Sequence, residues 1–283
     1  MRLVLMVLLL QLYSGEVFAQ VIDWPANDAA KAKCIASVNF ADLNRSVVNI
    51  VINNDQGKAN SGTAWFIDET HIATVDHVIT NEDTNDPIIT TDWNNEDVFI
   101  GRTETVGEPW TEPLQVPVRL ARSVITGSPA NIVVLEVPKG TMEVFNATPA
   151  RVSFAKLTRD EAVVAIGYPV TDGSARLVFA VGNYRPPQPS TQPVSETEEK
   201  ALQYLWFEMT NFEGKDRLIL HGGTSGSPVF NCFGEVVAVV NDLVTQEGVD
   251  FGAFRAKEDM PTAWGNPTNT AVFSLGLADP MPE

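Results

Sequence analysis

One stretch in the last quarter of the chain decides its fold and its chemistry: His221-Gly222-Gly223-Thr224-Ser225-Gly226-Ser227-Pro228-Val229-Phe230. Glycine adopts backbone angles that other residues avoid, so this turn can bring successive N–H groups into one small space. Donors fixed in this way form an oxyanion hole, which stabilises the negative charge of an acyl-transfer transition state. The stretch predicts Ser225 as a nucleophile and the N–H groups of Gly223 and Ser225 as oxyanion donors. A plain Gly/Ser turn between strands is the alternative interpretation.

A second motif places a histidine at the end of a predicted hairpin. Residues 61–67 have the pattern of an apolar strand, residues 68–70 form a turn, and residues 71–75 form a return strand that leads to His77. A general base needs such a rigid support if its ring is to face a nucleophile across a cleft. We therefore expect His77 to act as the base, and we assign no role to His71.

Several blocks of the sequence resemble the chymotrypsin-fold (trypsin-like) serine proteases, most closely the bacterial glutamyl endopeptidase-like and Deg-type branches. These blocks are Gly62-Thr-Ala-Trp-Phe-Ile with Asp76-His77-Val78, then Gly167-Tyr168-Pro169, and finally Gly223-Thr-Ser-Gly-Ser-Pro. The resemblance extends over about residues 40–256. It implies an all-β fold of two six-stranded antiparallel β-barrels with the active-site cleft between them. It also implies that His77 takes the proton of Ser225.

The chain departs from this family at the third position of the catalytic triad. The family usually has an aspartate at the start of the segment 131–137, and this chain has Asn131. Asparagine can accept a hydrogen bond from the histidine ring but lacks the charge that stabilises the imidazolium, and this exchange costs roughly 10⁴-fold in kcat in another protease. Asp76, Asp92 and Asp97 are candidate substitutes for the missing acid.

Asn131 therefore leaves two functions open. The first is a secreted serine endopeptidase whose turnover is weakened by Asn131, and the second is a catalytically impaired protease-like domain that binds peptides or a protein partner. The order of the residues disfavours an α/β-hydrolase, whose triad runs in the order Ser, acid, His. All three histidines, His71, His77 and His221, precede Ser225.

Two positions bear on the substrate pocket and one on activation. Ile219, six residues before Ser225, would lie at the base of the pocket and would favour an apolar or small side chain. Asn241 lies in the following strand, where glutamyl endopeptidases usually carry a histidine. Thr224 replaces the aspartate that trypsin-type zymogens pair with a freed N-terminus, so we expect no such activation switch.

The N-terminus has the pattern of a secretory signal peptide, with Arg2 before an apolar run and a small-residue cleavage pattern at 17–19. The net charge is −17, and removing residues 1–19 takes away Arg2 and Glu16, so −17 remains. Such an acidic chain disfavours nucleic acids and anionic membrane surfaces. We expect a secreted or periplasmic monomer that acts on peptides or proteins, with no metal or organic cofactor and no membrane contact after signal cleavage.

Export also bears on the two cysteines, Cys34 and Cys232. We expect them to form a disulfide in an oxidising compartment, with two free thiols as the alternative. The expected organisation is a signal peptide at 1–19, an N-terminal arm at 20–44, a first β-barrel at 45–145, a second β-barrel at 146–257 that includes a strand at 249–255, and a C-terminal tail at 258–283.

Overall fold

The structure is a computed structural model. It describes residues 33–34, 36–53, 59–81, 86–93, 98–121, 132–153, 155, 157–171, 173–184, 205–211, 222–244 and 262–267. The expectations that concern the signal peptide at 1–19, Asp97, Asn131, Ile219 and the strand at 249–255 lie outside these residues.

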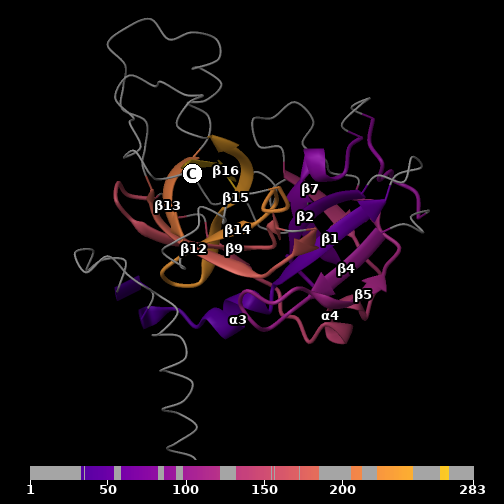
Figure 1. The fold of residues 1–283 in the computed structure, drawn as a ribbon, viewed down its shortest axis with the longest axis horizontal. Coiled ribbons are helices and arrows are strands. Elements are labelled where there is room, and N and C mark those ends of the chain that lie inside the picture. The colour runs from indigo at the N-terminus through magenta and orange to yellow at the C-terminus, as the bar shows by residue number, and fades with distance from the viewer. Residues whose placement is uncertain are drawn as a thin grey trace, which may run out of the picture.

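Seven strands from the first half of the chain form one antiparallel sheet (Figure 1). They are β1 (Val47–Asn53), β2 (Ala59–Phe66), β3 (His71–Val75), β4 (Val98–Arg102), β5 (Thr111–Gln115), β6 (Arg119–Leu120) and β7 (Ile132–Glu136). Their order across the sheet is β5-β4-β1-β2-β3-β7-β6. The side chains of Ile50, Ile72 and Leu135 are fully buried, as expected where branched apolar residues face a core.

The two edges of this sheet, β5 and β6, belong to one chain segment that is interrupted only at residues 116–118. Pro117 has no backbone N–H to donate to a ladder, so regular pairing stops there. On one side of the interruption the segment pairs with β4, and on the other side it pairs with β7. One chain segment thus joins both edges, which curls the sheet into a barrel.

The second sheet also has seven strands, in the order β14-β9-β12-β13-β16-β15-β8. They are β8 (Arg151–Val152), β9 (Ala162–Gly167), β12 (Val178–Tyr184), β13 (Leu205–Asn211), β14 (Pro228–Asn231), β15 (Glu235–Val244) and β16 (Thr262–Pro267). An additional antiparallel pairing between β14 and β15 closes six of these strands into a ring, with β8 outside it, parallel to β15. The two sheets confirm the predicted double-barrel fold.

Strand β16 lies within the segment that we expected to be a C-terminal tail. It pairs with β13 on one side and with β15 on the other. Its sequence, Thr-Ala-Trp-Gly-Asn-Pro, contains three residues that are depleted in strands, so no local signal predicts it. The strand forms because β13 and β15 each offer an edge that must be paired to close the ring.

The remaining elements are short. They are the helices α3 (Phe40–Asn44) and α4 (Thr141–Val144), the 3₁₀ turn η1 (Asp76–Val78), and the small hairpin β10 (Val170–Thr171) and β11 (Ser174–Ala175). In the described part of the chain, no helix is long and apolar enough to cross a membrane.

Tyr168 joins the second sheet to the first. It follows β9, and its fully buried hydroxyl accepts a hydrogen bond of 3.1 Å from the backbone N–H of Thr103, just after β4. Burial raises the pKa of Tyr168 to about 12, although the Thr103 bond and the charge of Arg102 act to lower it. The side chain therefore stays neutral at physiological pH, as a residue between two packed sheets must.

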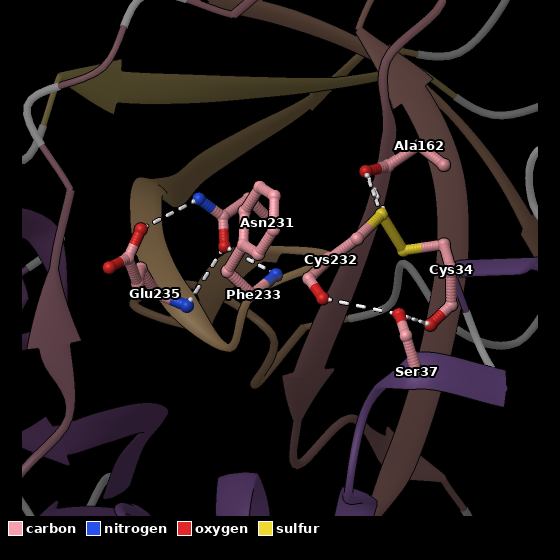
Figure 2. The surroundings of a disulfide bond; sticks show 7 residues. All are labelled: Cys34, Ser37, Ala162, Asn231, Cys232, Phe233 and Glu235. Atoms are coloured by element: carbon pink, nitrogen blue, oxygen red, sulfur yellow. Dashed lines mark hydrogen bonds between the residues drawn. A yellow bond between two sulfur atoms is a disulfide. The ribbon is translucent and has the colours of Figure 1, made fainter.

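A disulfide between Cys34 and Cys232 confirms the predicted pairing (Figure 2). It ties the N-terminal arm to the turn between β14 and β15. The Ser37 hydroxyl lies 2.7 Å from the Cys34 carbonyl oxygen and 3.2 Å from that of Cys232, so it contacts both ends of the cross-link. Cys232 Sγ lies 3.2 Å from the carbonyl oxygen of Ala162, the first residue of β9.

Loss of the disulfide is expected to destabilise the fold. The bond spans 198 residues, and a cross-link that closes so long a loop restricts the unfolded chain strongly. The double variant Cys34→Ser/Cys232→Ser should lose about 2–5 kcal/mol of unfolding free energy, measured by chemical denaturation. The wild type in excess reductant should match the variant. Equal stability of the oxidised wild type and the double variant would contradict the expectation.

Candidate active site

The glycine-rich loop, residues 222–227, precedes β14 and packs directly against the first barrel. Gly223 and Gly226 have positive φ angles of +97° and +90°, which residues with a side chain rarely adopt. A Cβ on Gly226 would lie 1.9 Å from the carbonyl oxygen of Thr63 in β2. A Cβ on Gly223 would lie 2.6 Å from the carbonyl oxygen of Tyr168. Both positions therefore require glycine, because the φ angle is positive and because a neighbouring backbone carbonyl lies where a Cβ would be.

Every carbonyl oxygen from residue 222 to residue 225 accepts a hydrogen bond. The donors are Val170 N–H to Gly222 O at 2.7 Å, the Thr63 hydroxyl to Gly223 O at 2.8 Å, Ser227 N–H to Thr224 O at 2.9 Å, and Thr63 N–H to Ser225 O at 2.8 Å. Two of these four bonds come from one residue of β2, and a third comes from the start of β10. The loop is thus held from outside as well as by its own turn.

These bonds also decide where the N–H groups of the loop point. A trans peptide places its C=O and N–H on opposite sides, and the structure contains no cis peptide among its described residues. The N–H of Gly223 therefore points away from the donor that holds Gly222 O, and the N–H of Ser225 points away from the donor that holds Thr224 O. Neither N–H donates to any described residue. Within the described part of the chain, the N–H groups of Gly223 and Ser225 thus have no backbone acceptor.

The histidine of the hairpin lies on the neighbouring element. His77 is in η1, directly after β3, and its side chain is 48% exposed. The next residue, Val78, is buried against Gly62 of β2, where a Cβ would lie 2.6 Å from Val78 Cγ2 and 3.2 Å from Ser225 O. Strand β2 therefore contacts both the turn that carries His77 and the loop that carries Ser225 at Gly62.

Asp76 is the acidic group nearest to His77 among the described residues. Its Oδ1 accepts a hydrogen bond of 2.7 Å from the His77 backbone N–H and lies 3.8 Å from the ring Nδ1. The second distance is too long for a hydrogen bond but short enough for an ion pair with a protonated ring. Burial raises the pKa of Asp76, although the His77 N–H bond and the His77 charge act to lower it. Asp92 has an exposed side chain.

The register of β7 concerns the third triad position. Ile132, the first residue of β7, pairs with Val75, the last residue of β3. Because His77 follows Val75 by two residues, the chain enters β7 beside the end of β3 that leads to the histidine. Asn131 itself precedes the described part of this strand.

Three further residues from the sequence analysis, Asn241, Thr224 and His71, lie in the described part of the structure. Asn241 is in β15, where the register with β16 shifts between Val240 and Asp242. Thr224 is buried. His71 lies at the opposite end of β3 from His77, and its Nδ1 is 2.9 Å from both carboxylate oxygens of Asp68.

Asp68 and His71 secure the turn between β2 and β3. Burial acts to raise the pKa of Asp68, but the hydrogen bond from the Thr70 backbone N–H and the His71 contact outweigh it and lower that pKa. We find no contact of this pair with the glycine-rich loop among the described residues. The absence of a role for His71 in the chemistry stays a prediction.

Three residues around the loop were not singled out by the sequence: Thr63 and Val170, which hold its carbonyls, and Tyr168, whose N–H donates to the Thr63 hydroxyl at 2.9 Å. The Thr63 hydroxyl and Gly223 O are 160 residues apart in the chain. A contact of this kind leaves no local pattern, although Thr63 and Tyr168 both lie inside blocks that carry the family resemblance.

Comparison with known proteins agrees with this architecture. Residues 62–239 match the trypsin-like peptidase domain family. The chain belongs to this family. The matched residues include most of β2, η1 and the whole glycine-rich loop. The match to the trypsin-like peptidase domain therefore covers the candidate site.

Serine proteases are among the solved structures to which this trypsin-like peptidase domain is similar. A serine-to-alanine mutant of Rv3671c from M. tuberculosis, in an inactive form, is 16% identical with a TM-score of 0.50, over 92% of this chain and 100% of that one. The active form of the Rv3671c protease from M. tuberculosis is 18% identical with a TM-score of 0.49, over 93% of this chain and 92% of that one. A serine endoprotease from Yersinia pestis is 15% identical with a TM-score of 0.49, over 88% of this chain and 66% of that one. No curated protein matches the sequence.

Alanine at Gly226 is expected to disrupt the loop. The new Cβ would lie 1.9 Å from Thr63 O, and the alanine would have to keep the positive φ of this position. Strain and overpacking together should cost on the order of 2–5 kcal/mol of unfolding free energy. Gly140→Ala is the matched control, because Gly140 also has a positive φ of +96° but has no heavy atom within 4 Å of the new Cβ. Thermal unfolding of both variants gives the comparison, and equal losses would contradict the close packing of loop and β2.

Proposed function

We propose that this trypsin-like peptidase domain is a secreted serine endopeptidase that acts through an acyl-enzyme. Ser225 is the nucleophile, His77 is the general base, and the N–H groups of Gly223 and Ser225 form the oxyanion hole. The observation that carries the proposal is the hydrogen bonding of the loop. The four carbonyls of residues 222–225 are held by other groups, while the N–H groups of Gly223 and Ser225 have no acceptor among the described residues. A simple turn between strands has no need of this arrangement.

The proposed reaction follows from these groups. His77 takes the proton of the Ser225 hydroxyl while the oxygen attacks the peptide carbonyl carbon, and the carbonyl oxygen becomes an oxyanion between the two N–H donors. The C–N bond then breaks, and the protonated His77 gives its proton to the leaving amine. Water, deprotonated by His77, attacks the acyl-enzyme. The bond between the acyl carbon and Ser225 Oγ then breaks, His77 returns its proton to Ser225 Oγ, and the carboxylate leaves. The reaction needs no metal or organic cofactor.

The proposed site is completed by a weak third member. Asn131 would accept a hydrogen bond from the His77 ring and orient it without supplying charge. The Asp76 carboxylate, 3.8 Å from His77 Nδ1, would supply part of the missing charge when the ring is protonated. We propose that catalysis is therefore slower than in relatives with an aspartate at the third position.

The setting of the proposed enzyme is outside the cytoplasm. A cleaved signal peptide at 1–19 would export the chain, and the Cys34–Cys232 disulfide is compatible with an oxidising compartment. We propose a monomer that acts on peptides or proteins, with Ile219 and Asn241 lining a pocket for an apolar or small side chain. Because Thr224 is not acidic, the hole should form without pairing to a freed N-terminus.

Labelling with a fluorophosphonate probe tests the central claim. The wild type should be labelled at Ser225, and Ser225→Ala should abolish labelling because the attacking oxygen is gone. His77→Ala should slow labelling by at least about 100-fold, since a positioned base contributes about 10²–10⁴. A wild type that is folded by thermal unfolding but never labelled would sink the enzyme proposal and favour the peptide-binding alternative.

A double-variant cycle separates the two candidates for the missing charge. Asn131→Asp should raise kcat, by a factor between about 10 and 10⁴, because a charged acceptor stabilises the imidazolium. Asp76→Asn should lower kcat in the wild type but hardly at all in the Asn131→Asp background, where the introduced carboxylate would do the same work. Steady-state kinetics on one peptide substrate gives all four values. A neutral or damaging Asn131→Asp would show that residue 131 is not at the acid's position.

A further inference from the structure

Thr63 has more contacts with the glycine-rich loop than its place in β2 requires. It is fully buried, and both its backbone and its side chain bond to the loop. Its N–H donates to Ser225 O at 2.8 Å, and its hydroxyl donates to Gly223 O at 2.8 Å. The same hydroxyl oxygen accepts the N–H of Tyr168 at 2.9 Å. One residue of the first barrel is thus bonded to the residues on both sides of Thr224.

The direction of the hydroxyl proton follows from its partners. A backbone N–H can only donate, so the Thr63 oxygen accepts from Tyr168. A hydroxyl has a single proton, and the backbone carbonyl of Gly223 can only accept, so the proton lies on the line to Gly223 O. Gly223 O receives no other hydrogen bond from a described residue. The hydroxyl therefore holds the Gly223–Thr224 peptide through its carbonyl oxygen.

The orientation of this peptide matters because the loop contains two successive glycines, Gly222 and Gly223, whose backbones rotate easily. Val170 N–H holds the peptide before Gly223 through Gly222 O, and the Thr63 hydroxyl holds the peptide after it. Val170 and Tyr168 belong to one short segment after β9, so this segment, Thr63 and the loop form one bonded unit. Loss of the hydroxyl would remove the bond that holds the second of these peptides through Gly223 O.

We infer that Thr63 is a positioning residue for the oxyanion hole: its hydroxyl holds the Gly223–Thr224 peptide, which links the peptide that carries the Gly223 N–H to the peptide that carries the Ser225 N–H. The inference rests on the proposed function, because it assigns Thr63 a part in the same reaction. Thr63 touches neither substrate nor Ser225 Oγ in this role. It acts through the backbone of the loop, and the N–H of Gly223 makes the contact with the oxyanion.

The test compares three variants in the full chain. Thr63→Val keeps the volume of the side chain and removes the hydroxyl, whereas Thr63→Ser keeps the hydroxyl and removes the methyl group. Thr141→Val is the matched control, because Thr141 is also buried and its hydroxyl donates to a backbone carbonyl, Pro138 O at 2.7 Å, in α4, outside the loop and its supports. Each variant is measured for thermal unfolding, for kcat and KM on a peptide substrate, and for inhibition by a peptide aldehyde, whose adduct carries an oxyanion.

Loss of the hydroxyl should affect the transition state and spare substrate binding. Since removing a whole oxyanion donor costs about 10²–10³ in kcat, Thr63→Val should lower kcat and the fluorophosphonate labelling rate by about 10–100-fold. The aldehyde inhibition constant should rise by a similar factor, while KM stays within about threefold. Thr63→Ser should stay within about threefold of the wild type in kcat, and Thr141→Val should lower the melting temperature without changing kcat. If Thr63→Val does not fold, Thr63→Ala, which leaves room for a water in place of the hydroxyl, is measured instead.

Two results would overturn the inference while leaving the proposed function intact. In the first, Thr63→Val keeps the kcat and aldehyde affinity of the wild type and loses only stability, as Thr141→Val does. In the second, Thr63→Ser falls as far as Thr63→Val, which would assign the effect to the methyl group. A wild type that fluorophosphonate does not label would overturn the proposed function itself, and the inference with it.

Discussion

The hydrogen bonds between β2 and the glycine-rich loop are the interaction on which the rest of the structure depends. Through Thr63, one strand of the first barrel bonds to the carbonyl oxygens of Gly223 and Ser225 in the second. Gly62, the preceding residue, lets Val78 and the Ser225 backbone approach the same strand. The two barrels thus meet at the loop itself, and a change in how they meet would change the loop.

Strand β14 transmits this constraint into the second barrel. It has four residues, all buried, and it pairs with β9 on one side and with β15 on the other. The glycine-rich loop precedes it, and the turn that contains Cys232 follows it. The disulfide to Cys34 therefore secures one end of β14, while the bonds to Thr63 secure the loop at the other end. Ser225, the proposed nucleophile, lies in the loop just before this short strand and gains rigidity from both attachments.

The candidate site has few charged groups close to the His77 ring among the described residues. The loop offers two uncharged donors, which work best when no water competes with them. His77 is half exposed, and the nearest described acid, Asp76, is bonded to its backbone rather than to its ring. In the proposed mechanism, stabilisation of the oxyanion therefore contributes more than activation of the serine. Asn131 in the sequence points in the same direction, because an amide orients a histidine without stabilising its charge.

The sequence by itself predicted the fold class, the disulfide and the residues proposed to carry the chemistry. The disulfide follows from two cysteines in an exported chain, and the fold and the residues follow from short blocks, such as the one around Ser225, that resemble the chymotrypsin-fold proteases. The sequence did not reveal β16, whose Gly, Asn and Pro residues become a strand only because β13 and β15 leave edges to be paired. Nor did it reveal Thr63 and Val170, which bond to the loop across long stretches of chain. Only the tertiary structure could decide these, since a hydrogen bond between distant segments depends on how the barrels pack and leaves no periodicity in either segment.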